Sequence, residues 1–218
     1  MNRDFQLNQG IWLGDYAFGP DPATGNFGIV AVNVVDRQRQ GGVCHAMSTE
    51  WLFAQLNGRP WNVQQEYWRA VSHQRAYAIY WQDALRGHWG GGHYQQYLQI
   101  ALRPTRDYVA NPARRQHRNF HSARVASLNF LRFHIADLGV NSGFVIVMFG
   151  VDNNDNWGHT VAIHRDGGGT YRFVDVNFGQ YSWPGGTAGL QVGQETRQFL
   201  HQWYGNDGIR DVYLFRVG

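Results

Sequence analysis

The chain has 218 residues and a formal net charge of +3, and all 19 of its basic side chains are arginine. This charge is too small to predict a nucleic-acid-binding protein, which concentrates basic side chains on one face. No run of about 18 to 20 apolar residues could span a membrane, and the start of the chain lacks a signal peptide. We therefore expect neither a stable membrane anchor nor Sec-dependent export, and a single monomeric domain over residues 1–218.

The first half of the chain is predicted to be mainly helical after an irregular leader. Residues 1–40 are rich in Gly, Asn and Asp, and their one clear strand signal is the apolar run 27–35. From Cys44, apolar side chains recur at helical spacing as far as the breaker Asn57-Gly58. Further helical zones are expected over 61–85 and 94–102.

The second half changes from a helical to an extended pattern. Spacings of three and four from Val125 to Leu138 predict a helix, and the apolar run 144–149 predicts a buried strand. Two strands should then form a hairpin, followed by one helix and a last strand: 159–164, 171–176, 189–204 and 212–217. Helices followed by antiparallel strands predict an α+β fold with segregated layers.

Cys44 is the only cysteine, so it can form neither an internal disulfide nor a multi-cysteine metal site. Its two natural interpretations are a small buried hydrophobe and an activated nucleophile. The predicted helix begins at Cys44, and the partial positive charge of a helix N-terminus stabilises a thiolate. A nucleophile would also need a histidine, itself oriented by an acid or an amide.

The predicted hairpin supplies a histidine and an acid. With the centre of the turn at Gly167, His159 faces Asp175 directly across the two strands, within reach of a hydrogen bond. The neighbouring histidines are weaker candidates. His45 would project from another face of its helix, in an exposed or supporting position, and His164 would point to the opposite side of its strand.

Three short motifs then resemble the YopT and AvrPphB group of papain-like cysteine proteases, which are bacterial effectors and related toxins. The motifs are Gly42-Val43-Cys44 with Trp51 one helical stretch later, Gly158 to Ile163, and Phe173 to Gly179. By this resemblance, Cys44 is the nucleophile, His159 the general base and then acid, and Asp175 the orienting carboxylate. The sequence departs from the family after the acid, where Val176 replaces the usual proline before Asn177.

The resemblance implies a papain-like fold in which an N-terminal helical layer with the nucleophile packs on an antiparallel sheet. It also implies an amide side chain before the nucleophile that binds the oxyanion together with the cysteine's backbone amide. Gln38 is the first candidate for this amide and Gln40 the second. No metal or other cofactor is expected, since the chain has no HExxH, P-loop or GxSxG motif.

The expected function is that of a secreted bacterial effector or toxin that cuts a target-cell protein with a Cys-His-Asp triad. Such a protein would leave by a type III or type VI system and act in the target-cell cytoplasm, and a toxin of this kind also implies an immunity protein or chaperone as a partner. Three alternatives stay open: a glutamine deamidase or transglutaminase on the same fold, a peptidoglycan amidase, and a non-catalytic binding module.

Overall fold

A computed structural model describes eight segments of the chain: 1–6, 16–20, 27–31, 44–61, 120–125, 127–152, 155–205 and 208–218. The expected helices at 61–85 and 94–102 lie outside these segments, apart from Trp61. The same is true of both glutamine candidates for the oxyanion site, Gln38 and Gln40.

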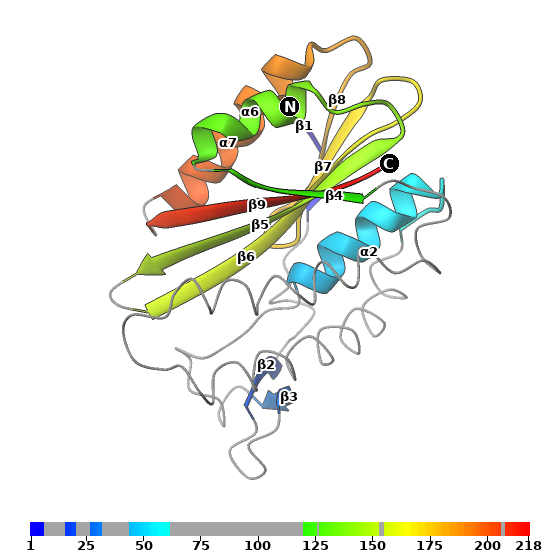
Figure 1. Cartoon of the computed structure of the whole chain (residues 1–218). Helices are drawn as coiled ribbons and strands as arrows, with labels where there is room; N and C mark the ends of the chain where they lie inside the picture. Colours follow the sequence, from blue (N-terminus) through cyan, green and yellow to red (C-terminus); the bar gives the residue numbers. More distant parts are fainter. Residues whose placement is uncertain are drawn as a thin grey trace.

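The described part is built on an antiparallel sheet with the strand order β1-β8-β7-β6-β5-β9-β4 (Figure 1). Its strands are β1 (Asn2–Gln6), β4 (Phe120–Val125), β5 (Ser142–Asp152), β6 (Asp155–Arg165), β7 (Tyr171–Asp175), β8 (Gly179–Trp183) and β9 (Ile209–Val217). A second, two-stranded sheet pairs β2 (Tyr16–Pro20) with β3 (Phe27–Ala31).

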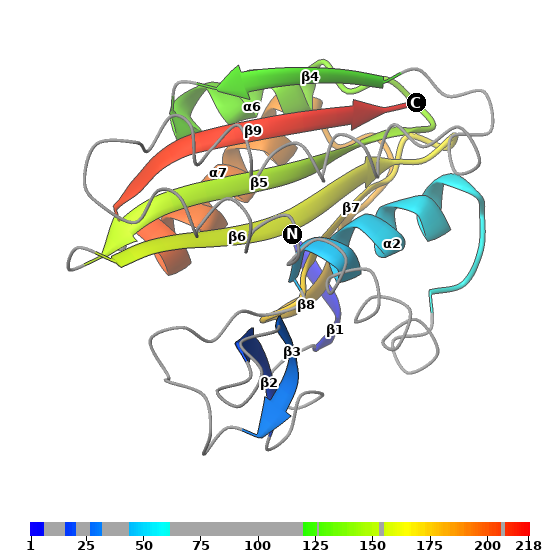
Figure 2. The same cartoon turned by 60° about the horizontal axis from the view of Figure 1, so that its bottom comes forward.

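Helices cover both faces of the larger sheet (Figures 1 and 2). Helix α2 (Cys44–Leu56) packs on one face, whereas α6 (Leu128–Ala136) and α7 (Gly189–Tyr204) pack together on the other. This arrangement confirms the predicted α+β class. None of the described helices is long and apolar enough to cross a membrane.

The continuous apolar run of β5 follows from this two-sided coverage. Successive side chains of a strand point to opposite faces, so a strand covered on both faces needs apolar residues at consecutive positions. Phe144, Ile146 and Met148 belong to the core under α6 and α7. Their neighbours Val145 and Val147 belong to the core under α2. The central strand therefore joins two hydrophobic cores.

The predicted helix that begins at Cys44 is confirmed. Helix α2 buries an apolar stripe against the sheet, and its end coincides with the predicted breaker. Gly58 adopts a positive φ of 63°, a conformation that glycine accepts without steric cost. The stripe consists of Met47, Trp51, Leu52 and Leu56.

Two expectations for the fold were wrong. The described residues of the segment 1–40 form three strands rather than one, and β1 is an edge strand of the main sheet through its pairing with β8. Every residue of β1 is exposed, so the strand has no apolar alternation to reveal it. Val125 ends strand β4 opposite Val212 instead of opening α6, because the backbone is still extended at Ser127.

Gly143 in β5 lets helix α2 approach the sheet closely. A Cβ atom at this position would lie 2.3 Å from Leu52 Cδ1 and 2.6 Å from the carbonyl oxygen of Ile163. Real Cβ atoms do not approach other heavy atoms so closely, so a side chain at residue 143 would displace the helix or the neighbouring strand.

We expect the substitution Gly143→Ala to lower the free energy of unfolding by about 1–3 kcal/mol, since over-packing strains a close-packed core. Urea unfolding monitored by circular dichroism measures this change. Gly185→Ala is the matched control, because the nearest atoms to a Cβ there are 3.7 and 3.8 Å away. Equal stability of the two variants would show that the packing of α2 on the sheet does not require a glycine at residue 143.

Candidate active site

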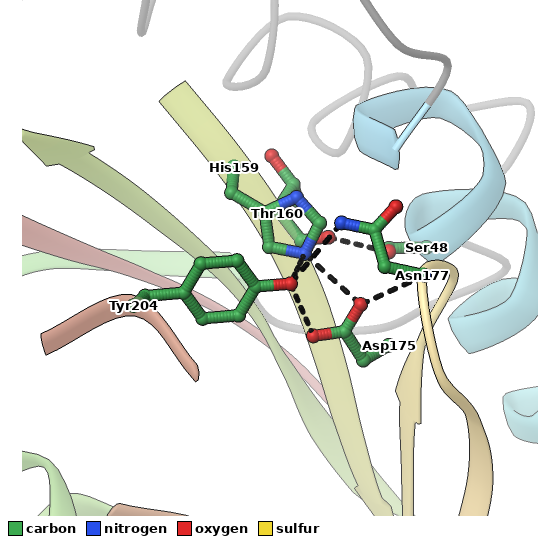
Figure 3. A network of polar contacts seen from close by, with 6 residues as sticks. All are labelled: Ser48, His159, Thr160, Asp175, Asn177 and Tyr204. Atoms are coloured by element: carbon green, nitrogen blue, oxygen red, sulfur yellow. Dashed lines mark hydrogen bonds and ion pairs between the residues drawn. The ribbon is translucent and has the colours of Figure 1, made fainter. Parts of the chain in front are cut away.

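The three residues singled out in the sequence come from three different elements. Cys44 is the first residue of α2, His159 lies in β6, and Asp175 is the last residue of β7. Figure 3 shows the imidazole of His159 and the carboxylate of Asp175 pointing toward each other. The His159 Nε2 atom lies 3.1 Å from Asp175 Oδ1, and both side chains are buried.

The register of the β6–β7 hairpin differs from the predicted one by two residues. Ala162 pairs with Val174 and Arg165 with Tyr171, which centres the turn on Gly168 rather than Gly167. His159 therefore does not face Asp175 directly, and the predicted opposed pair was wrong. A shift of two residues preserves the face of the sheet, whereas a shift of one would have inverted it. The two side chains still meet, along a diagonal.

The position of the pair at the end of the β6–β7 ladder explains how it can meet a helix from elsewhere. The last paired residues are Ala162 and Val174, so His159 lies three positions beyond the ladder on β6. Asp175 is one position beyond it on β7. Backbone pairing between the two strands has stopped there, and the side chains of His159 and Asp175 take the place of the ladder hydrogen bonds.

The environment of His159 favours its charged form. Burial is the largest influence and lowers the pKa of the imidazole, but the negative charge and hydrogen bond of Asp175 oppose it. A hydrogen bond to the Cys44 side chain and the charge of that group raise the pKa further. Together these groups raise the pKa of His159 from 6.5 to about 10, so it is an imidazolium at neutral pH.

Cys44 differs from its two partners in exposure. Its side chain is half-buried, whereas His159 and Asp175 are almost completely enclosed. Since Nε2 of His159 faces Asp175, the other ring nitrogen, Nδ1, is the one left for Cys44. A molecule arriving from solvent can therefore reach the sulfur while the imidazole and the carboxylate stay protected.

The Asp175 carboxylate accepts hydrogen bonds from three sides. Oδ1 accepts the backbone amide of Asn177 at 2.9 Å in addition to its contact with His159. Oδ2 accepts the hydroxyl of Tyr204, at the end of α7, also at 2.9 Å. These donors compensate the carboxylate for the water that burial removes.

Side chains at the start of α2 fix the helix to β6 next to the site. Ser48 Oγ donates a hydrogen bond of 2.9 Å to the carbonyl oxygen of Thr160, the residue after His159. The Thr160 hydroxyl lies 3.5 Å from Nδ1 of His45, the residue after Cys44. His45 is buried, so the exposed position allowed for it was wrong and the supporting position is correct. These contacts fasten the first turn of α2 to β6 beside His159.

The indole of Trp51 makes a similar connection further along the helix. Its Nε1 atom donates a hydrogen bond of 2.7 Å to Oε1 of Gln180 in β8, and its ring is fully buried. Trp51 belongs to one of the three sequence motifs, and its contacts give it a structural role. It anchors the middle of α2 to the strand that follows Asp175.

Two polar groups of the site had no signal in the sequence. Tyr204 and Ser48 lie on predicted helices, where nothing in the apolar periodicity distinguishes them from other residues. Tyr204 Oη contacts both His159 and Asp175, at 2.9 Å each. Among the described residues, no group of three His, Cys, Asp or Glu side chains could hold a metal ion.

The raised pKa of His159 predicts how stability depends on pH. In the unfolded chain the imidazole titrates near 6.5 and in the folded chain near 10, so its ionic contribution is complete below pH 6.5 and is lost as pH rises toward 10. The difference in unfolding free energy between wild type and His159→Gln should therefore shrink over this range, by on the order of a few kcal/mol.

Urea unfolding of both proteins at pH 6, 8 and 10 measures this trend. The same comparison in a Cys44→Ala background, which lacks two of the influences that raise the pKa of His159, should show the loss at a lower pH. If the stability difference were constant over this pH range, His159 would not be charged in the folded protein.

Comparison with known proteins finds similarity in structure alone. No protein-family model matches the sequence, and no curated protein matches it. Among solved structures, the fold is similar to the crystal structure of the Pseudomonas avirulence protein AvrPphB, with a TM-score of 0.51. The match covers 81% of this chain and 91% of the other at 16% sequence identity. The chain therefore has a fold distantly similar to that of AvrPphB.

Proposed function

We propose that this protein is a papain-like cysteine peptidase in which Cys44, His159 and Asp175 form the catalytic triad. The observation that supports this most strongly is the buried His159–Asp175 pair beside a half-exposed thiol at a helix N-terminus. The distant similarity of fold to AvrPphB agrees with the group that the sequence motifs resemble.

The nucleophile is the thiolate of Cys44. Its proton passes to Nδ1 of His159, and the resulting imidazolium is stabilised by the Asp175 carboxylate. The N-terminus of α2 adds a partial positive charge on the other side of the sulfur. The resting enzyme therefore holds a thiolate–imidazolium ion pair and needs no external base. Solvent can reach the sulfur of this pair.

The reaction begins when the sulfur attacks the carbonyl carbon of a peptide bond and pushes the carbonyl electrons onto oxygen. His159 then donates its Nδ1 proton to the leaving nitrogen, the C–N bond breaks, and an acyl-enzyme remains. A water molecule gives its proton to the neutral imidazole and attacks the acyl carbon, which releases the acid and regenerates the thiolate. The backbone amide of Cys44 and the side chain of Gln38, or of Gln40, would bind the oxyanion.

The biological setting proposed for this reaction is that of an effector or toxin. The substrate is a protein of the target cell, in which the enzyme acts after delivery by a type III or type VI system. Its support is the resemblance of the three motifs to a group of bacterial effectors, together with the similar fold of an avirulence protein.

The reactivity of the thiol tests the ion pair without knowledge of the substrate. At pH 6.5 a free model thiol is about 1% thiolate, so we expect Cys44 to react with iodoacetamide about tenfold faster than N-acetylcysteine. Cys44 is the only cysteine, so the intact mass of the protein reports this residue alone. His159→Gln should remove the excess rate.

The matched control for this measurement is His201→Gln, which replaces an exposed histidine of α7. It should alkylate at the wild-type rate. If wild-type Cys44 reacted no faster than the model thiol, the thiolate mechanism would be excluded and a non-catalytic binding module would be favoured.

The chemistry of the product distinguishes peptidase action from other acyl transfer. Proteins of a eukaryotic cell lysate incubated with the enzyme should gain new N-termini, and Cys44→Ala should reduce their rate of appearance about 10⁶-fold. Mass spectrometry with N-terminal labelling detects these products. A gain of about 1 Da on glutamine without cleavage would instead show a deamidase, and release of peptides from cell-wall fragments an amidase.

A further inference from the structure

Tyr204 contacts the proposed triad from the opposite side of the sheet to Cys44. It is the last residue of α7, and its hydroxyl lies 2.9 Å from His159 Nε2 and 2.9 Å from Asp175 Oδ2 (Figure 3). Its ring stacks on the imidazole, with the ring centres 4.7 Å apart and an angle of 28° between the planes. Tyr204 therefore restrains the His159 ring both by stacking on its face and by the polar contact at Nε2.

The hydrogen-bonding capacity of this hydroxyl is fully used. It donates its one proton to Asp175, and it accepts from Nδ2 of Asn177 at 3.2 Å. Its remaining acceptor position faces Nε2 of His159. Burial is the main cause that raises the pKa of Tyr204 above its ordinary value, and the charge of Asp175 adds to it. Both influences favour the protonated hydroxyl, which is the form that donates to Asp175.

The packing of α7 holds the tyrosine in this place. Gly193 lies against the backbone of Arg132 in α6, where a Cβ atom would approach the carbonyl oxygen to 2.4 Å. Near the site, the ring of Phe178 meets that of Tyr204 edge to face, with centres 6.3 Å apart. The hydroxyl is therefore presented to His159 by a helix that is closely packed along its length.

We propose that Tyr204 is a positioning residue of the active site, which holds the His159 imidazole with Nε2 toward Asp175 and Nδ1 toward Cys44. This inference rests on the proposed function, because it concerns the same triad. A phenyl ring would fill the same volume and keep the stacking contact. The hydroxyl itself is needed only by the three polar groups that it contacts: His159, Asp175 and Asn177.

The same hydroxyl protects the His159–Asp175 hydrogen bond from water. Asp175 is fully buried, and Tyr204 occupies the side of its carboxylate that His159 and Asn177 do not reach. A hydrogen bond to a charge is stronger when water cannot compete for it. Tyr204 therefore acts on the thiol only through the imidazole, which distinguishes it from a residue that touches the substrate.

The test is the substitution Tyr204→Phe, measured by the rate of Cys44 alkylation with iodoacetamide from pH 4 to 10. The titratable groups that face His159 are Cys44 from α2, Asp175 from β7 and Tyr204 from α7. With the hydroxyl removed, the imidazole can rotate and Asp175 loses a donor. We expect the midpoint of the acid limb of the rate profile to rise by about one pH unit.

Tyr181→Phe is the matched control, because Tyr181 is as buried as Tyr204 and packs on Phe199 in the same core. Its hydroxyl makes no hydrogen bond to His159 or Asp175, and Asp175 acts on it through charge at longer range. This variant should keep the wild-type midpoint, and thermal unfolding of both variants shows whether the fold is intact. A second readout is the ¹⁵N spectrum of the His159 imidazole recorded above pH 10, where the neutral ring predominates. It should show the proton on Nε2 in wild type and a mixture of tautomers in Tyr204→Phe.

The outcomes separate this inference from the proposed function. Wild-type Cys44 can show an acid limb of the rate profile below that of a free thiol while Tyr204→Phe leaves both the midpoint of this limb and the imidazole tautomer unchanged. In that case the tyrosine has no positioning role, although the triad stands. If wild-type Cys44 has the profile of a free thiol, the proposed function fails. A shift in both readouts for Tyr204→Phe, with Tyr181→Phe unchanged, establishes the positioning role.

Discussion

The interaction on which the site depends is the buried ion pair between His159 and Asp175. Removing two charges from water costs several kcal/mol per ion, and their mutual attraction repays this only when further hydrogen bonds satisfy the remaining atoms. Here the carboxylate accepts from Asn177 and Tyr204 as well as contacting the imidazole. The raised pKa of His159 shows that attraction outweighs burial. His159 and Tyr204 come from stretches of chain distant from Asp175, so the complete set of contacts forms only when β6, β7 and α7 are folded together.

The two faces of the sheet meet at this pair. Helix α2 lies on one face and supplies Cys44, whereas α7 lies on the other and supplies Tyr204 (Figure 2). They can meet because pairing between β6 and β7 stops at Ala162 and Val174, just before the two site residues. The site therefore depends on close packing of both helix layers. Two glycines with no space for a Cβ atom allow that packing: Gly143 of β5 under α2, and Gly193 of α7 against the backbone of α6.

Much of the local structure could be predicted from the sequence, because burial imposes a period on the chain. The helix at Cys44 and the helix over 189–204 were found within their observed bounds, since each has an apolar stripe and a clear end. The strand at 144–149 was found for the same reason, because it is apolar on both faces. Strand β1 was missed because it is fully exposed and is held by backbone pairing and polar side-chain contacts, which leave no apolar alternation in the sequence.

The hairpin between β6 and β7 shows where the information in the sequence ends and the tertiary structure decides. The sequence by itself determined which residues of each strand share a face, because alternation along a strand depends only on residue parity. That His159 and Asp175 share a face, and lie on a diagonal, was decided by the turn, which is centred on Gly168. Tyr204, 45 residues from His159, was decided by tertiary structure alone. Local periodicity records which side of an element is buried, but not which distant side chain completes the hydrogen bonds there.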